Sequence, residues 1–471
     1  MSEKQIYIVL KRNNDRVVDY ALSTTEIDQI WIDERFKSNK ETEDESATQT
    51  DDESKEGKEN GDVPPYPLTF GDVEEAFAQA MLMYRKSVVE TISLAPILAT
   101  VRLNQSIDNL TKKRGEKLPG LSNGEIEVFT LPHHAGYSIN RHVDESSALV
   151  DGALHLPKIA TIGIISSYDA ILTDLLRVIF LSKPETIFTS EREIKFSELV
   201  RFNSIEAARE SIVNNEIESV VRRSHHDQFF WMEKRFGMLL REGLDIWPDF
   251  IELCERRNLL THTGGVVSDQ YLQNCADYGR NSVFKVGEKL NVDLDYLVKS
   301  IGIITEIGCK LIHTMWRKFA PDQRSDADSH LNGFGMDLIA AKEFDTAIKI
   351  LEFGVNQKQH SSDLCRRMMV VNLANALKLG GNLDRCNRVL SKHDWSATSY
   401  QFQICVAAVR DNFEEVCRFL KMGEDVTGIT PSNFRDWPVF LEARKQQMVQ
   451  EAFETVFGEE LFRSEAEPSK D

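Results

Sequence analysis

The sequence predicts a mainly α-helical protein with a small N-terminal α/β region, a central helical bundle and a C-terminal helical-repeat region. Three observations lead to this prediction. Apolar residues recur with helical spacing over most of the chain after residue 69, short alternating runs occur near the N-terminus, and similar helical patterns recur in the last third. At 471 residues, the chain is long enough to bury two or three separate cores.

Residues 1–36 are expected to form a β/α segment. Alternating residues at 6–11 and 16–21 flank the turn signal Asn13-Asn14-Asp15, which predicts a hairpin, and a brief helix is expected over residues 27–36. Residues 37–65 are rich in Glu, Asp, Ser, Thr and Lys and contain almost no aliphatic side chains. Because such a segment cannot offset its ordering entropy by burial, we expect a disordered acidic linker there.

Residues 66–157 are expected to be helical at first and then irregular or β-like. A helical pattern begins at Thr69 and continues to Leu110, and the sequence Lys112-Lys113-Arg114-Gly115 is typical of a helix end. Residues 125–131 and 146–156 alternate in places, which indicates β structure on either side of a Pro132-His133-His134-Ala135-Gly136 break.

Residues 158–320 are expected to form a bundle of four to six helices. Breaks are predicted at Lys183-Pro184, near residues 202–204, at Gly243 and at Gly264-Gly265. Between them, apolar spacing predicts a long helix over residues 206–240 and another over residues 246–262.

Residues 328–460 carry a degenerate repeat, and residues 461–471 are expected to form a flexible tail. Corresponding apolar positions at 344, 383 and 413 lie 39 and 30 residues apart, close to the period of tetratricopeptide-like helical hairpins. The Trp/Tyr/Pro signature of that repeat is missing. Stacked hairpins present a concave surface, so a protein partner or trigger is expected here.

The charge of the chain and the motifs that it lacks argue against several classes of protein. The net charge of −19 argues against a protein that coats nucleic acid non-specifically, although ten acidic residues lie within residues 41–62 alone. No run is apolar enough for a membrane span, and the N-terminus lacks the pattern of a signal peptide, so we expect a cytoplasmic protein with no membrane partner. No phosphate-binding glycine loop or metal-ligand spacing is present, so we expect no cofactor and no metal.

The seven cysteines form no C-x-x-C pair and mostly fall within apolar helical patterns, which favours reduced core residues over disulfides or zinc ligands. Cys254 lies one turn before Arg257 on the predicted helix. Its apolar neighbours favour an inert core thiol over a nucleophile.

The motif with the clearest chemistry is Arg257-Asn258-Leu259-Leu260-Thr261-His262. An arginine can hold a phosphate through its planar fork of donors, and a histidine can exchange protons near neutral pH. RNA supplies its own nucleophile, the 2′-hydroxyl, so a base and a cation are sufficient to break its backbone. By spacing alone, a surface arginine and a helix-terminal histidine explain the pattern better than a catalytic pair does, because R-x-x-x-x-H arises often by chance.

The context of this motif closely resembles the R-N-x-x-x-H signature of the HEPN superfamily of all-helical proteins. The resemblance covers roughly residues 158–315 and includes Ser167-Tyr168-Asp169 and Phe236-Gly237-Met238. It implies a metal-independent endoribonuclease, typical of toxin, abortive-infection and anti-phage defence systems, that forms a homodimer with a composite Arg/His cleft. On this reading Arg257 and His262 are catalytic and Asn258 orients the site. Gly264 replaces the tyrosine that a related toxin group carries as a modification site.

Several readings remain open. Arg256 is either a second phosphate contact or a solvated charge. The cluster Arg222-Arg223-Ser224-His225-His226-Asp227 is either a basic wall of an RNA cleft or a set of exposed helix residues, and the acidic linker is either a spacer or a competitor of RNA. The alternative function for the whole chain is a non-catalytic HEPN and helical-repeat scaffold or sensor.

Overall fold

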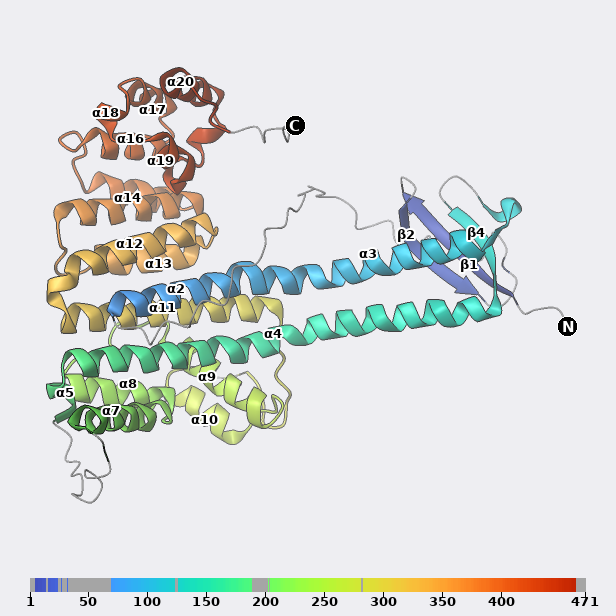
Figure 1. Ribbon diagram of the computed structural model, residues 1–471, viewed down its shortest axis with the longest axis horizontal. Coiled ribbons are helices and arrows are strands. Elements are labelled where there is room, and N and C mark those ends of the chain that lie inside the picture. Colours follow the sequence, from blue (N-terminus) through green and yellow to red (C-terminus); the bar gives the residue numbers. More distant parts are fainter. Residues whose placement is uncertain are drawn as a thin grey trace. The chain divides into compact units, whose positions relative to one another are not determined.

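The computed structural model describes residues 5–13, 16–23, 27, 32, 69–122, 126–188, 202, 204–280 and 283–462 (Figure 1). It is mainly helical with a small N-terminal antiparallel sheet, as the sequence predicts. The chain divides into two compact units, residues 1–63 with 88–159 and residues 64–87 with 160–471, which we describe separately. The acidic linker, most of the short helix expected before it and nearly all of the C-terminal tail lie outside the described residues.

The first unit is built on a four-stranded antiparallel sheet of order β2-β1-β4-β3. Its strands are β1 (Gln5–Asn13), β2 (Arg16–Ser23), β3 (Glu116–Lys117) and β4 (Ile126–Pro132). The predicted hairpin is confirmed, because β1 pairs with β2 in a register that places Val9 opposite Ala21. Because successive side chains of β1 point to opposite faces of the sheet, Ile8 and Leu10 lie in one core and Val9 lies in the other.

Two helical segments complete this unit, α3 (Val89–Arg114) and residues 133–159 of the 50-residue helix α4 (His133–Ser182). They lie side by side, since the Ser146 hydroxyl donates to the backbone oxygen of Ala99 at 3.2 Å (Figure 1). The β structure expected over residues 146–156 is therefore wrong. Strong helix formers such as Ala148, Leu149 and Leu154 lie in this segment and outweigh its short alternation of polar and apolar residues. The helix end predicted at Gly115 is confirmed.

The second unit contains a helical bundle formed by residues from α2 to α11. The segments are α2 (Phe70–Met83), a π-helical turn at the unit boundary (Tyr84–Val88), residues 160–182 of α4, α5 (Glu185–Phe188), α7 (Ile205–Val221), α8 (His225–Phe236), α9 (Trp247–His262), α10 (Asp269–Asp277) and α11 (Leu294–Phe319). Aromatic rings join α4, α8 and α9, because Phe250 packs edge-on against Tyr168 at 5.6 Å and against Phe229 at 6.0 Å.

The long helix expected over residues 206–240 is wrong, because the chain breaks into α7 and α8. Ser224 caps α8, and its hydroxyl accepts a hydrogen bond from the Asp227 backbone nitrogen at 3.2 Å. The α8 helix then ends at Gly237, whose φ of +62° favours glycine. His225, the first residue of α8, is buried.

The rest of the second unit consists of short helices (Figure 1). They are η4 (Pro321–Gln323), α12 (Arg324–Ala340), α13 (Phe344–Val355), α14 (Asp363–Leu379), α15 (Leu383–Ser391), α16 (Tyr400–Val409), α17 (Phe413–Leu420), α18 (Glu424–Thr427), α19 (Pro431–Asp436), η5 (Pro438–Phe440), η6 (Ala443–Lys445) and α20 (Gln447–Phe457).

The same turn joins the helices of three successive pairs, α12–α13, α14–α15 and α16–α17. Lys342, Gly381 and Asp411 each adopt a positive φ, at 61°, 81° and 56°. In each turn the next backbone nitrogen donates to a carbonyl five residues back, for example Asn382 to Leu377 at 2.7 Å. The turns fall at the spacing expected from the sequence, while membership of the tetratricopeptide class stays a prediction.

The cysteines agree with a further expectation. Six of the seven cysteines are buried and all are free, while Cys365 is partly exposed. Among the described helices, none combines the length and the apolar character that crossing a bilayer would need.

Candidate functional site

The motif from Arg257 to His262 occupies the last two turns of α9, and the two glycines that follow it end this helix. The Gly264-Gly265 stop is confirmed, because both glycines adopt positive φ, at 66° and 93°. The Gly265 nitrogen donates to the Leu259 carbonyl at 2.9 Å, which satisfies a terminal carbonyl of the helix. His262 is therefore the last helical residue, as expected.

Arg257 is held in one orientation by two acceptors. Its Nη2 donates to Asp169 Oδ2 at 3.0 Å, and its Nη1 donates to Asn258 Oδ1 at 3.2 Å. The Arg257 side chain is 22% exposed and Asp169 is 23% exposed, so this ion pair lies at the surface of the bundle with one side open to solvent. Asp169 lies on α4, 88 residues earlier in the chain.

Asp169 also binds His225. The His225 Nε2 lies 3.0 Å from Asp169 Oδ1, so the two carboxylate oxygens face two different cationic groups. Burial lowers the pKa of His225, but Cys254 and the Asp169 carboxylate outweigh it and raise that pKa to about 10. At neutral pH His225 is therefore an imidazolium that donates to Asp169. Its burial rules out the exposed helix position expected from the sequence.

His262 has a different environment. Its side chain is exposed, and no hydrogen bond or ion pair with any other described residue involves it. Asn258 lies one turn earlier and is half-buried. The structure thus brings Arg257, Asn258 and Asp169 into contact and leaves the exposed His262 imidazole without a hydrogen-bond partner among the described residues.

Arg256 points away from this surface into a buried polar network. Its Nε donates to Glu252 Oε1 at 2.7 Å, its Nη1 donates to the Asn291 backbone oxygen at 3.1 Å, and its guanidinium lies 4.0 Å from the centre of the Tyr296 ring. Its side chain is 8% exposed. Arg256 is accordingly neither the solvated charge nor an accessible phosphate contact, and it stays outside the proposed site.

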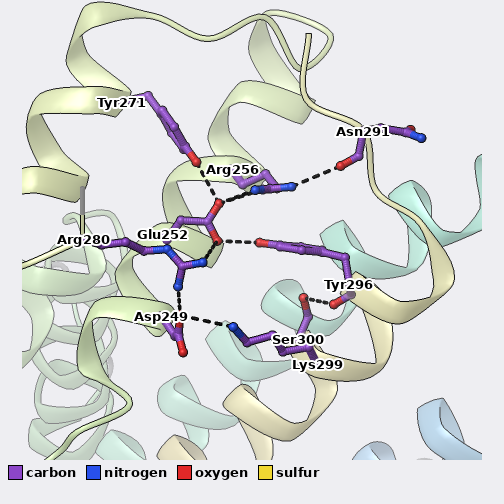
Figure 2. Close-up of polar contacts among 9 residues, drawn as sticks. All are labelled: Asp249, Glu252, Arg256, Tyr271, Arg280, Asn291, Tyr296, Lys299 and Ser300. Atoms are coloured by element: carbon purple, nitrogen blue, oxygen red, sulfur yellow. Dashed lines mark hydrogen bonds and ion pairs between the residues drawn. The ribbon is translucent and has the colours of Figure 1, made fainter. Parts of the chain in front are cut away.

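Glu252 is the centre of that network. Figure 2 shows Arg256, Tyr271 and Tyr296 converging on its carboxylate. The Tyr271 hydroxyl donates to Oε1 at 2.7 Å and the Tyr296 hydroxyl to Oε2 at 2.9 Å. Burial and the nearby Glu252 charge raise the pKa of both phenols, so both stay protonated donors. Because Tyr271 belongs to α10 and Tyr296 to α11, the network fixes α9 against both helices.

Asp249 extends the network to the surface. It forms ion pairs with Arg280 and, at 3.4 Å, with Lys299 (Figure 2). Neither Glu252 nor Asp249 was identified from the sequence. The only local signal is that Asp249, Glu252 and Arg256 follow one another at spacings of three and four residues, which identifies one helix face without naming its partners.

The described residues include no group of three or more His, Cys, Asp or Glu side chains arranged to hold a metal ion. No family model, no curated protein and no solved structure matches the chain.

Proposed function

We propose that this protein is a metal-independent RNA endonuclease in which Arg257 and His262 act on one phosphodiester. The observation that supports the proposal is the contrast between the two side chains. Arg257 is oriented by Asp169 and Asn258 at hydrogen-bonding distance, while His262, just over one turn further along α9, is exposed and without a partner among the described residues. An oriented cation beside a free imidazole matches what RNA transesterification requires.

The chemistry assigns one role to each group. His262 accepts the proton of the 2′-hydroxyl, the 2′-oxygen forms a bond to phosphorus, and the bond from phosphorus to the 5′-oxygen breaks. The products are a 2′,3′-cyclic phosphate and a 5′-hydroxyl. Arg257 stabilises the charge that develops on the phosphoryl oxygens, and Asp169 is a positioning residue that holds the guanidinium.

A second proton donor is needed for the leaving 5′-oxygen. One imidazole cannot easily remove a proton from the 2′-oxygen and protonate the 5′-oxygen at the same time. A second copy of His262 in a homodimer, or a water molecule, supplies that proton. The HEPN resemblance favours the dimer, and it favours a role in toxin-type growth arrest or anti-phage defence, with helices α12–α17 recruiting a protein partner or trigger.

The test is cleavage of single-stranded RNA by the purified full-length chain in the presence of EDTA. We expect cyclic phosphate ends, loss of cleavage when the 2′-hydroxyl at the cut position is replaced by hydrogen, and a fall of about 100-fold or more in His262→Ala and Arg257→Ala. Arg141→Ala is the matched control, because that arginine is 79% exposed and forms its ion pair with Glu145 one turn along its own helix, outside the proposed site. Cleavage that needs a metal, or that survives in His262→Ala, contradicts the proposal.

The second candidate function is a non-catalytic scaffold. The pairing of Arg257 with Asp169 favours it, because an ion pair between α4 and α9 also stabilises the bundle. This reading predicts no cleavage under any trigger, and a loss of thermal stability in Arg257→Ala that Asp169→Asn reproduces.

A further inference from the structure

We propose that α3 carries a docking surface for a second copy of this chain, whose own α3 binds antiparallel along an exposed apolar stripe. The stripe consists of Leu94, Ile97, Leu98 and Val101, and it belongs to the first compact unit. The inference is independent of the proposed RNA cleavage, because none of these residues belongs to the candidate site. The surface is also distinct from the helical bundle through which the HEPN resemblance implies a homodimer.

The first support is the spacing and the exposure of these four side chains. Their positions i, i+3, i+4 and i+7 place them within about 100° of arc on one face of α3. Leu94 is 50% exposed, Ile97 58%, Leu98 63% and Val101 46%. Single exposed apolar residues are ordinary on a protein surface, but four at this spacing form the kind of seam that another helix covers.

The opposite face of α3 is already packed within its own unit. Ile92 and Ala99 are 6% and 2% exposed, and the Ala99 backbone oxygen accepts a hydrogen bond from Ser146 on α4 at 3.2 Å. At 100° per residue, Ile92 and Ala99 point about 150–170° away from the middle of the stripe. This part of α3 is therefore apolar on both sides, and a helix of that kind is usually covered on both sides.

The length of the uncharged part of α3 restricts what can cover the stripe. Residues 91–101 carry no charge, and Glu90 and Arg102 flank them. This run rises about 16 Å along the helix axis, whereas a helix that crosses a bilayer needs about 20 apolar residues. The stripe is therefore too short for a membrane span, and its length matches the apolar face of another short helical segment.

The charges at the two ends of the stripe favour a second copy as the occupant. Glu90 lies just before the stripe and Arg102 just after it; both are exposed, and neither forms an ion pair with another described residue. When a second α3 lies antiparallel, the Glu90 end of each copy meets the Arg102 end of the other, so two acid–base pairs form about one two-fold axis. A parallel copy would instead bring like charges together.

The same antiparallel alignment brings the apolar residues level with one another. Pro96 is midway between Glu90 and Arg102, so a two-fold axis at its height sets Leu94 of one copy level with Leu98 of the other. Four side chains that are each about half exposed make a contact smaller than the roughly 800 Å² per partner of a standard interface. We therefore expect a reversible dimer with a dissociation constant on the order of micromolar.

The experiment measures self-association of the full-length chain by sedimentation over concentrations of about 1–100 µM. Leu98→Glu should weaken self-association by on the order of tenfold or more, because it places a charge in the middle of the stripe. Leu154→Glu is the matched control, since Leu154 is 66% exposed on α4 of the same unit but lies outside the stripe, and it should associate like wild type. Self-association that Leu98→Glu leaves unchanged belongs to another surface and overturns the proposal.

A charge exchange tests the antiparallel arrangement. Glu90→Arg and Arg102→Glu should each weaken self-association severalfold, because each variant opposes like charges at both ends of the stripe. An equimolar mixture of the two variants pairs a chain that has two cations with a chain that has two anions, so it should associate at least as tightly as wild type. A mixture that associates no better than the separate variants overturns the antiparallel pairing. A wild-type chain that stays monomeric and binds phosphatidylcholine–phosphatidylserine vesicles overturns the second copy in favour of a lipid surface.

Discussion

Replacing Glu252 with glutamine should destabilise the second unit far more than replacing the half-buried Glu255 on the same helix. Glu252 and Arg256 are 4% and 8% exposed at their side chains, so the substitution leaves a buried guanidinium without its carboxylate. Breaking a buried ion pair by removing one partner costs about 3–5 kcal/mol. At about 2 °C per kcal/mol, the value for larger chains, the melting temperature should fall by about 6–10 °C.

The assay is a thermal melt followed by circular dichroism, with Glu255→Gln as the matched control. Glu255 lies on the same helix and is half-buried, and it has no ion-pair partner among the described residues, so its substitution should stay within about 0.5 kcal/mol of wild type. The double variant Glu252→Gln with Arg256→Met should lose less stability than the two single losses added together. Equal melting temperatures for Glu252→Gln and Glu255→Gln would refute the reasoning.

The same thermal melt followed by circular dichroism tests three further predictions. Gly308→Ala should cost about 1–3 kcal/mol, because its new methyl group would overlap the Phe77 ring, whereas Gly333→Ala meets no atom within 4 Å and should be neutral or stabilising. His262→Ala should leave the melting temperature unchanged, since this exposed side chain has no partner among the described residues. Burial opposes ionisation of Glu74, but His330, whose Nδ1 lies 2.9 Å from Glu74 Oε2, and His313, whose Nε2 lies 3.8 Å from Oε1, lower its pKa from 4.5 to about 2. It therefore adds stability above pH 4.5 that is lost as the pH falls toward 2, and the advantage of wild type over Glu74→Gln should shrink over that interval.

Much of the fold follows from local sequence signals. Helical spacing, the hairpin of β1 and β2 and the Gly264-Gly265 stop depend on residues that are close in the chain, and the sequence predicts each of them. The break before α8 also had a local signal, since Ser224 and Asp227 form a capping pattern within an apolar helix. It was missed because the apolar spacing continues across the break.

The candidate site was less predictable because its contacts are long-range. No local pattern identifies Asp169 as the partner of both Arg257 and His225, since the three residues meet only when α4, α8 and α9 pack. Similarly, Arg256 and Arg257 are adjacent and chemically identical. A rotation of about 100° on the helix sends one into the core and the other to the surface, and only the packing of α10 and α11 decides which.

The buried position of Arg256 and the surface position of Arg257 connect the stability of α9 to the proposed function. Arg256 and Glu252 fix the inner face of α9, and the positions of Arg257 and His262 on its outer face depend on that anchor. A loss of activity in Glu252→Gln should therefore come from a displaced helix, and it should diminish at low temperature, where the helix stays in place. Loss in His262→Ala should persist at every temperature, because the proton acceptor itself is gone. Two variants on one helix would thus separate positioning from chemistry.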